Sequence, residues 1–249
     1  MIKNYASYLF NKTIKSVYVT RNSDFKLIEN LIISYTKKRM TEKEVLDKFI
    51  SYIQSLTRKE ISDNSSHKIN YITDSVDIKP SKILDIGAGN ATILHSLGKY
   101  YNIPKESLYA LDLQPIQRDD VTIISYTDDM KIPLEDGSID LIVMLSLLHH
   151  VPERDGLLSE VNRVLSPNGR VIIREHDGSN NDLAYYIFLQ LLHYVWYVYN
   201  NESRDPLLLM TRNQTVELFL KHGMVSHIYI KPVGNSNLQQ IYGEIYKKN

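Results

Sequence analysis

Apolar residues in the middle of the chain form short continuous runs, and stretches with apolar positions three and four residues apart lie between them. The runs are short enough for buried strands, and the intervening spacing predicts amphipathic helices. Regular alternation of this kind indicates parallel strands joined by crossover helices, in a doubly wound α/β sheet. The predicted strands are 82–86, 108–113, 121–126, 141–145 and 170–175, with helices at 91–101 and 153–165.

The flanking regions follow other patterns. Helical spacing recurs at 25–35 and 45–56, and Thr41-Glu42-Lys43-Glu44 before the second stretch has the form of a capping box. We therefore expect residues 1–79 to form an N-terminal helical layer ahead of a domain at 80–249. After the core, the pattern predicts a helix at 211–221 and strands at 225–230 and 240–247.

A glycine loop follows the first predicted strand. Asp85 ends the apolar run and is followed by Gly87 and Gly89, which allow a sharp turn and a close approach to a ligand. The next helix directs its free N–H groups at that loop. A dinucleotide fingerprint would place a third glycine where Thr92 stands, so the loop favours another nucleotide-like cofactor. The Asp85 carboxylate suits a cationic end, such as the amino group of a methionine moiety.

Polar residues also follow the other predicted strands. Asp112 comes 27 residues after Asp85, and an acid there can bind two ribose hydroxyls. Ligands of open parallel sheets bind outside the carboxyl ends of the strands, so these residues should meet at one edge. The set comprises Asp85, Asp112, Asp128, Ser146 and the cluster Glu175-His176-Asp177.

With these motifs, residues 80–177 resemble class I S-adenosylmethionine-dependent methyltransferases, most closely the ubiquinone/menaquinone-type and small-molecule group. The resemblance rests on Asp-x-Gly-x-Gly, the ribose acid, the run from Asp128 to Asp140 and the His149-His150 segment. It implies a mostly parallel, seven-stranded Rossmann-like sheet whose last strand lies antiparallel beside the fifth, and S-adenosylmethionine as cofactor. Ala91 stands where this family usually has a third glycine.

The resemblance also implies a set of site residues. For proton transfer the candidates are His149 and His150, with Glu175 and His176 opposite, because imidazole titrates near neutrality. One of the paired histidines could instead cap the helix that begins near 153. No metal is expected. The cofactor-binding candidates are Asp85, Gly87, Ala88, Gly89, Asn90, Asp112, Leu113, Asp128, Asp129, Met130, Leu145, Ser146 and His150.

Aromatic residues are concentrated at Leu183–Tyr199, which includes Tyr185, Tyr194 and Trp196. We expect a buried helix that lines the acceptor pocket, as part of a lid at about 180–210; ordinary core packing is the alternative. The stretch is shorter than the roughly 20 residues that a bilayer requires, and it contains Gln190 and His193. A membrane span is therefore not favoured.

Composition and charge restrict the class of protein to which this sequence can belong. The 249 residues include no cysteine, which excludes disulfides, a Cys-based zinc site and a Cys nucleophile, and favours a cytoplasmic protein. The net charge is zero, but residues 1–80 carry +5, residues 81–200 carry −7 and residues 201–249 carry +2. The basic N-terminal section could contact nucleic acid, although a solvated helix face explains it more simply.

Missing motifs restrict the methyl acceptor. Leu145-Ser146-Leu147-Leu148 stands where enzymes that methylate base amino groups carry Asn/Asp-Pro-Pro-Tyr/Phe. A small-molecule or lipid-like acceptor is the preferred interpretation. The alternatives are a tRNA wobble base, a cap guanine N7, or a subunit that binds the cofactor without catalysis and acts as a scaffold.

Overall fold

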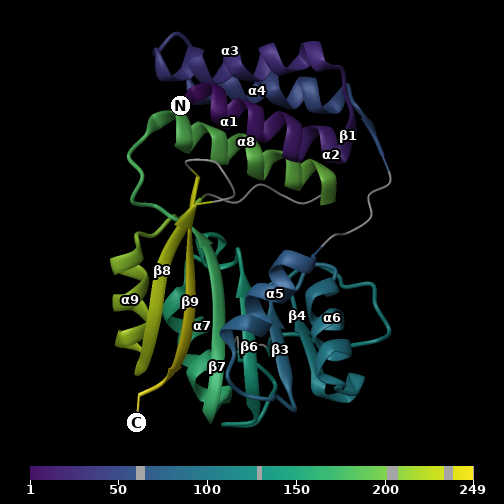
Figure 1. The fold of residues 1–249 in the computed structure, drawn as a ribbon, viewed down its shortest axis with the longest axis vertical. Helices are drawn as coiled ribbons and strands as arrows, with labels where there is room; N and C mark the ends of the chain where they lie inside the picture. Colours follow the sequence, from purple (N-terminus) through teal and green to yellow (C-terminus); the bar gives the residue numbers. More distant parts are fainter. Residues whose placement is uncertain (60–64, 128–130, 201–206, 233–237, 249) are drawn as a thin grey trace. The chain divides into compact units, whose positions relative to one another are not determined.

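The computed structural model describes residues 1–59, 65–127, 131–200, 207–232 and 238–248. Its chain forms two compact units (Figure 1). The helical unit comprises Met1–Ser62, Ser179–Leu207 and Pro232–Gln239. The sheet unit comprises Asp63–Gly178, Leu208–Lys231 and Gln240–Asn249.

The helical unit packs its helices through aromatic contacts. Tyr185 and Phe188 of α8 lie against Tyr5, with ring centroids 5.9 and 5.7 Å apart, and Tyr194 lies 6.5 Å from Phe49 of α4. The elements are α1 (Ile2–Tyr8), the π-helix η1 (Leu9–Ile14), α2 (Lys15–Val17), β1 (Tyr18–Val19), η2 (Asn22–Asp24), α3 (Phe25–Thr36), α4 (Glu42–Gln54), β2 (Thr57–Arg58) and α8 (Leu183–Asn200).

The structure confirms the two predicted amphipathic helices as α3 and α4. The capping box is also present, because the Thr41 side chain accepts from the Glu44 N–H while the Glu44 carboxylate accepts from the Thr41 N–H. The predicted aromatic helix is α8, and its role as a lid stays a prediction. Within the described ranges, no helix is both long and apolar enough to cross a membrane.

The sheet unit alternates strands and helices as the sequence predicts. One helix, α5, was missed; its apolar residues Ile69 and Ile72 directly follow the expected polar break at 62–66. The elements are α5 (Ser66–Ser75), β3 (Ile83–Ile86), α6 (Thr92–Tyr101), η3 (Lys105–Ser107), β4 (Leu108–Leu111), β5 (Thr122–Ile124), β6 (Ile139–Leu145), η4 (Leu148–His150), α7 (Arg154–Val164), β7 (Leu165–His176), α9 (Arg212–Lys221), β8 (Met224–Pro232) and β9 (Gln239–Lys247).

The strands form one seven-stranded sheet in the order β5-β4-β3-β6-β7-β9-β8. Strands β3 to β7 run parallel, with Leu84 paired to Tyr109 on one side and Ile142 on the other. Strand β9 pairs antiparallel with β7, which confirms the predicted place of the last strand. The chain leaves β3 toward β4 and later returns to β6, so the topological switch point lies between β3 and β6.

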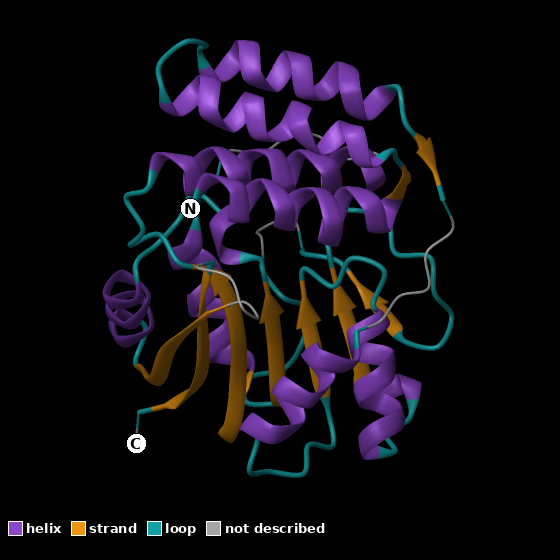
Figure 2. Cartoon of the chain, turned by 45° about the horizontal axis from the view of Figure 1, so that its top comes forward, coloured by secondary structure: helices purple, strands orange, loops and turns teal. Residues whose placement is uncertain are grey.

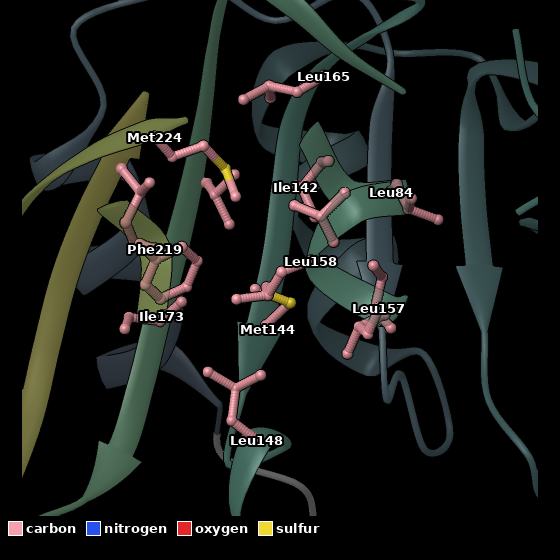
Figure 3. Packing of buried hydrophobic residues seen from close by; sticks show 14 of the residues in the cluster. Leu84, Ile142, Met144, Leu148, Leu157, Leu158, Leu165, Ile173, Phe219 and Met224 are labelled. Carbon is pink, nitrogen blue, oxygen red and sulfur yellow. The ribbon is translucent and has the colours of Figure 1, made fainter. Parts of the chain in front are cut away.

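Two apolar layers cover the sheet, because alternate strand residues point to opposite faces. Leu84, Ile142 and Ile173 pack against α7 and α9, where Leu158 and Phe219 are fully buried (Figure 3). The next residues along the strands, such as Ile83 and Val143, pack with α5 and α6 on the other face. Figure 1 shows α5 and α6 in front of the sheet and α7 behind it. Because helices cover both faces of the central strands β3, β4 and β6, the ends of these strands are their accessible part.

Candidate functional site

The glycine loop leaves the end of β3 in a left-handed backbone conformation. Gly87 has φ +73°, and its N–H donates to the Leu111 carbonyl at 2.8 Å. Helix α6 begins after Ala91, whose φ is +54°, and the Asn90 side chain accepts from the Thr92 N–H and hydroxyl. The loop is therefore tied to the end of β4 on one side and to the N-terminus of α6 on the other.

The loop contacts the segment that follows β6. A Cβ added to Gly87 would lie 2.9 Å from Leu147 Cδ1, so Leu147 packs directly on the bare backbone of Gly87. The neighbouring Ser146 has φ +58°, an uncommon conformation for a residue other than glycine, and its N–H donates to the Arg174 carbonyl at 2.6 Å. The two loops at the switch point thus form one packed structure.

Asp85 lies at the end of β3 with only 4% of its surface exposed. Burial raises the pKa of its carboxyl group to about 7, against the lowering effect of Lys68, while Asp112 raises it further. No hydrogen bond to its carboxylate is found within the described part of the chain. A buried carboxyl group of this kind favours a cationic partner.

Asp112, after β4, faces the same loop. Its Oδ2 accepts from the Gly89 N–H at 2.8 Å, and its Oδ1 accepts from the Gln114 N–H at 2.9 Å. Each carboxylate oxygen can accept a further hydrogen bond, so the group can also hold hydroxyl groups. The loop is open here, because a Cβ added to Gly89 would meet no heavy atom within 4 Å.

Glu175 organises the histidine segment after β6. It is buried, and its Oε1 accepts from the Leu147 and Leu148 N–H groups at 2.8 and 2.7 Å, while Oε2 lies 2.5 Å from His149 Nδ1. Burial by itself would raise the pKa of Glu175, but the interaction with His149 and these hydrogen bonds lower it. Glu175 therefore acts as an ionised anchor for η4.

Arg154 also holds η4 in place. Its Nε donates to the Leu148 carbonyl at 2.8 Å, and its Nη2 donates to the Leu208 carbonyl. The Leu208 N–H in turn donates to the His149 carbonyl at 2.8 Å. No local sequence pattern indicates this clamp, because its partners are backbone groups far apart along the chain.

The three histidines of this segment have different surroundings. The His149 ring is 2% exposed and lies 4.2 Å from the His150 ring and 5.0 Å from the His176 ring, between centroids. Burial lowers the pKa of His150 to about 4, and the neighbouring His149 contributes to this shift. His150 is therefore neutral at pH 7, and its imidazole is a weak base.

The structure brings most of the predicted site residues together. Asp85, the glycine loop, Asp112 and Ser146 meet around the switch point, and Glu175 joins His149 and His176 beside it. Asp128, Asp129 and Met130 lie outside the described residues. Leu113 is 82% exposed, next to Asp112.

Comparison with known proteins assigns this architecture to a class. Residues 84–173 match the family model described as a methyltransferase domain. The chain is 31% identical to demethylmenaquinone methyltransferase of Streptomyces avermitilis over 109 residues, which are 42% of this chain and 46% of that protein. It is 29% identical to 27-O-demethylrifamycin SV methyltransferase of Amycolatopsis mediterranei over 106 residues, 37% of each chain. The match thus spans less than half the length of these curated relatives.

Among solved structures, YcgJ of Bacillus subtilis shares the fold with a TM-score of 0.53 at 14% identity, over 74% of this chain and 99% of that one. The chain carries a class I S-adenosylmethionine-dependent methyltransferase domain, and the cofactor of this domain is S-adenosylmethionine. The predicted family, Rossmann-like fold and cofactor are confirmed.

The site residues fit this cofactor. A buried carboxyl group such as that of Asp85 would suit the methionine ammonium group, and the Asp112 oxygens would suit the ribose hydroxyls. The open side of Gly89 leaves room for a ligand beside the backbone.

Proposed function

We propose that the protein transfers the methyl group of S-adenosylmethionine to a small, largely apolar acceptor. The observation that carries this proposal is the contact of Leu147 with Gly87, because it packs the segment bearing His149 and His150 on the cofactor loop. The names of the two relatives above refer to demethylmenaquinone and demethylrifamycin as acceptors, which supports an acceptor of this chemical class.

The bound cofactor supplies an electrophilic methyl group, and the rate then depends mainly on orientation and on exclusion of water. In this proposal Asp85 holds the ammonium end and Asp112 the ribose. Both carboxylates extend from parallel strands whose ends are fixed by the sheet, so they orient the ligand without loop rearrangement.

An acceptor hydroxyl or protonated nitrogen must also lose a proton. We assign this role to His149, because Glu175 lies at hydrogen-bonding distance from its Nδ1 and directs Nε2 away from the carboxylate. A carboxylate beside imidazole fixes the tautomer and the orientation of the ring, so that the other ring nitrogen is held in one place. In this proposal His150, with its pKa of about 4, contacts ligand without taking the proton.

The decisive experiment uses S-adenosylmethionine with a tritiated methyl group. The full chain is incubated separately with a deproteinised small-molecule extract of the source cells and with their total RNA. Label that moves into solvent-extractable small molecules supports the proposal. Label found only in RNase-sensitive material would replace it with RNA methylation, and cofactor binding without transfer to either fraction would indicate a scaffold subunit.

Two variants test the roles of the histidines. His149→Asn should abolish most transfer to a protonated acceptor with little change in cofactor affinity, whereas His150→Asn should retain most of it. Equal losses in both variants, at unchanged melting temperature, would contradict the assignment of the base.

A further inference from the structure

One face of the sheet unit carries aromatic and cationic side chains at alternating positions. On β9, Ile241 and Ile245 pack into the core, while Tyr242, Glu244 and Tyr246 occupy the positions between or beyond them. In Figures 1 and 2, none of the helices drawn crosses in front of β8 and β9 in the described part of this unit. We call this surface, formed by the outward positions of β7, β8 and β9, the tyrosine face; it includes Arg170, Arg174, Tyr229, Lys231, Tyr242 and Tyr246.

Three tyrosines form a row across this face. The Tyr71 ring of α5 meets the Tyr242 ring edge-on at 4.8 Å, and its hydroxyl donates to the Ile173 carbonyl. The Tyr229 ring on β8 lies 5.8 Å from the Tyr242 ring, and the two planes differ by 11°. Tyr71 is thus anchored by hydrogen bonds through its hydroxyl group. Tyr229 lies on the edge strand β8, and its ring is nearly parallel to that of Tyr242.

Cations accompany these rings. The ammonium group of Lys231 lies 5.0 Å above the Tyr229 centroid, and the Arg170 guanidinium lies 5.6 Å from the Tyr246 centroid. Arg174 lies beside Tyr242, and its Nε donates to Gln240 at 2.9 Å. Among the outward positions of the described strands β7, β8 and β9, Glu244 is the single carboxylate, and it pairs with Arg170.

Half-buried aromatic rings interleaved with cations match the requirements of unpaired nucleic acid, in which each base offers a face for stacking and each linkage a negative charge. A purely apolar ligand would leave Lys231 and Arg174 without a function, and duplex backbone binding would not need the tyrosines. We propose that the tyrosine face binds single-stranded nucleic acid, with a base stacked on Tyr229 and phosphates beside Lys231 and Arg174. This binding needs neither the cofactor nor methyl transfer.

The test is fluorescence anisotropy of the full chain, without cofactor, against a labelled single-stranded RNA of mixed sequence and against the same RNA as a duplex. We expect salt-dependent binding that prefers the single strand. Tyr229→Ala and Lys231→Ala should each weaken it about tenfold, and the salt dependence should become shallower in Lys231→Ala. Tyr100→Ala and Lys99→Ala on α6 are matched controls, because Tyr100 is 63% exposed and lies on a different part of the unit.

Each alternative outcome is distinguishable. No binding at low salt, equal binding of the duplex, or equal losses in the α6 controls would overturn the proposal. A wild-type dimer that Tyr229→Ala converts to monomer, without RNA binding, would assign the face to a second copy of the chain. Melting temperatures of all four variants exclude misfolding, since the substitutions replace exposed or half-buried side chains.

Discussion

The buried carboxyl group of Asp85 leads to a quantitative expectation for Asp85→Asn. The folded pKa of about 7 lies above the ordinary value of 3.8, so the folded protein retains a proton that the unfolded chain releases. The free energy of unfolding should therefore fall as pH rises from 3.8 to 7 and then level off. Each pH unit in this window corresponds to about 1.36 kcal/mol, so the full cost of ionised Asp85 reaches about 4 kcal/mol above pH 7.

Asparagine has the same shape but no charge, and it leaves a buried amide that costs roughly 1–3 kcal/mol at every pH. The comparison between pH values separates these two effects. Urea unfolding of both proteins at pH 5, 6, 7 and 8 should show the stability of Asp85→Asn relative to wild type increasing by roughly 2 kcal/mol between pH 5 and pH 7, then levelling off.

Asp140→Asn is the matched control. The Asp140 carboxylate accepts from Ser81 and Lys82, and although its burial opposes this, these hydrogen bonds lower its pKa. Its stabilisation is therefore present above the unfolded pKa and is lost only as pH falls below that value, so this variant should show a constant loss from pH 5 to pH 8. A constant difference for Asp85→Asn as well would refute the reasoning, because its carboxyl group would then not titrate in this window.

Ligand binding provides a second measurement of the same group. An ammonium ion needs the ionised carboxylate, so the affinity of wild type for S-adenosylhomocysteine should rise about tenfold per pH unit from pH 5 to pH 7. Asp85→Asn should bind weakly, with no such dependence. Calorimetry in buffers of different ionisation enthalpy should detect one proton released on binding to wild type near pH 6.

Three further expectations concern other residues. Asp112→Ala should weaken S-adenosylhomocysteine binding by about 1–3 kcal/mol in calorimetry with an unchanged melting temperature, and an unchanged Kd would place the ribose elsewhere. Tyr185→Ala removes a fully buried ring packed on Tyr5 and should lower the free energy of unfolding by roughly 3–5 kcal/mol. Trp196 is 46% exposed, so Trp196→Ala should lower it much less. Similar losses in the two variants would contradict the packing of α8. Thr41→Ala should cost about 1 kcal/mol in urea unfolding, and no loss would mean that the capping box does not stabilise α4.

The sequence by itself predicted most of the strands and helices of the sheet unit. Buried parallel strands are nearly continuous apolar runs, and their crossover helices repeat apolar residues at 3.6-residue spacing, so β3 to β7, α6 and α7 were recognisable from local pattern. Asp85, Gly87, Gly89 and Asp112 were recognisable as candidate cofactor-binding residues because such a loop needs special backbone conformations and charges at fixed distances along the chain.

Tertiary structure decided the features that depend on distant partners. The role of Glu175 follows from contacts with Leu147, Leu148 and His149, more than 25 residues away, and no local pattern encodes that anchoring. The raised pKa of Asp85 likewise depends on burial between strands that meet only in the fold. The tyrosine face has the same origin, since Tyr71, Tyr229 and Tyr242 come from three separate elements, and only sheet pairing and α5 packing place their rings in one row.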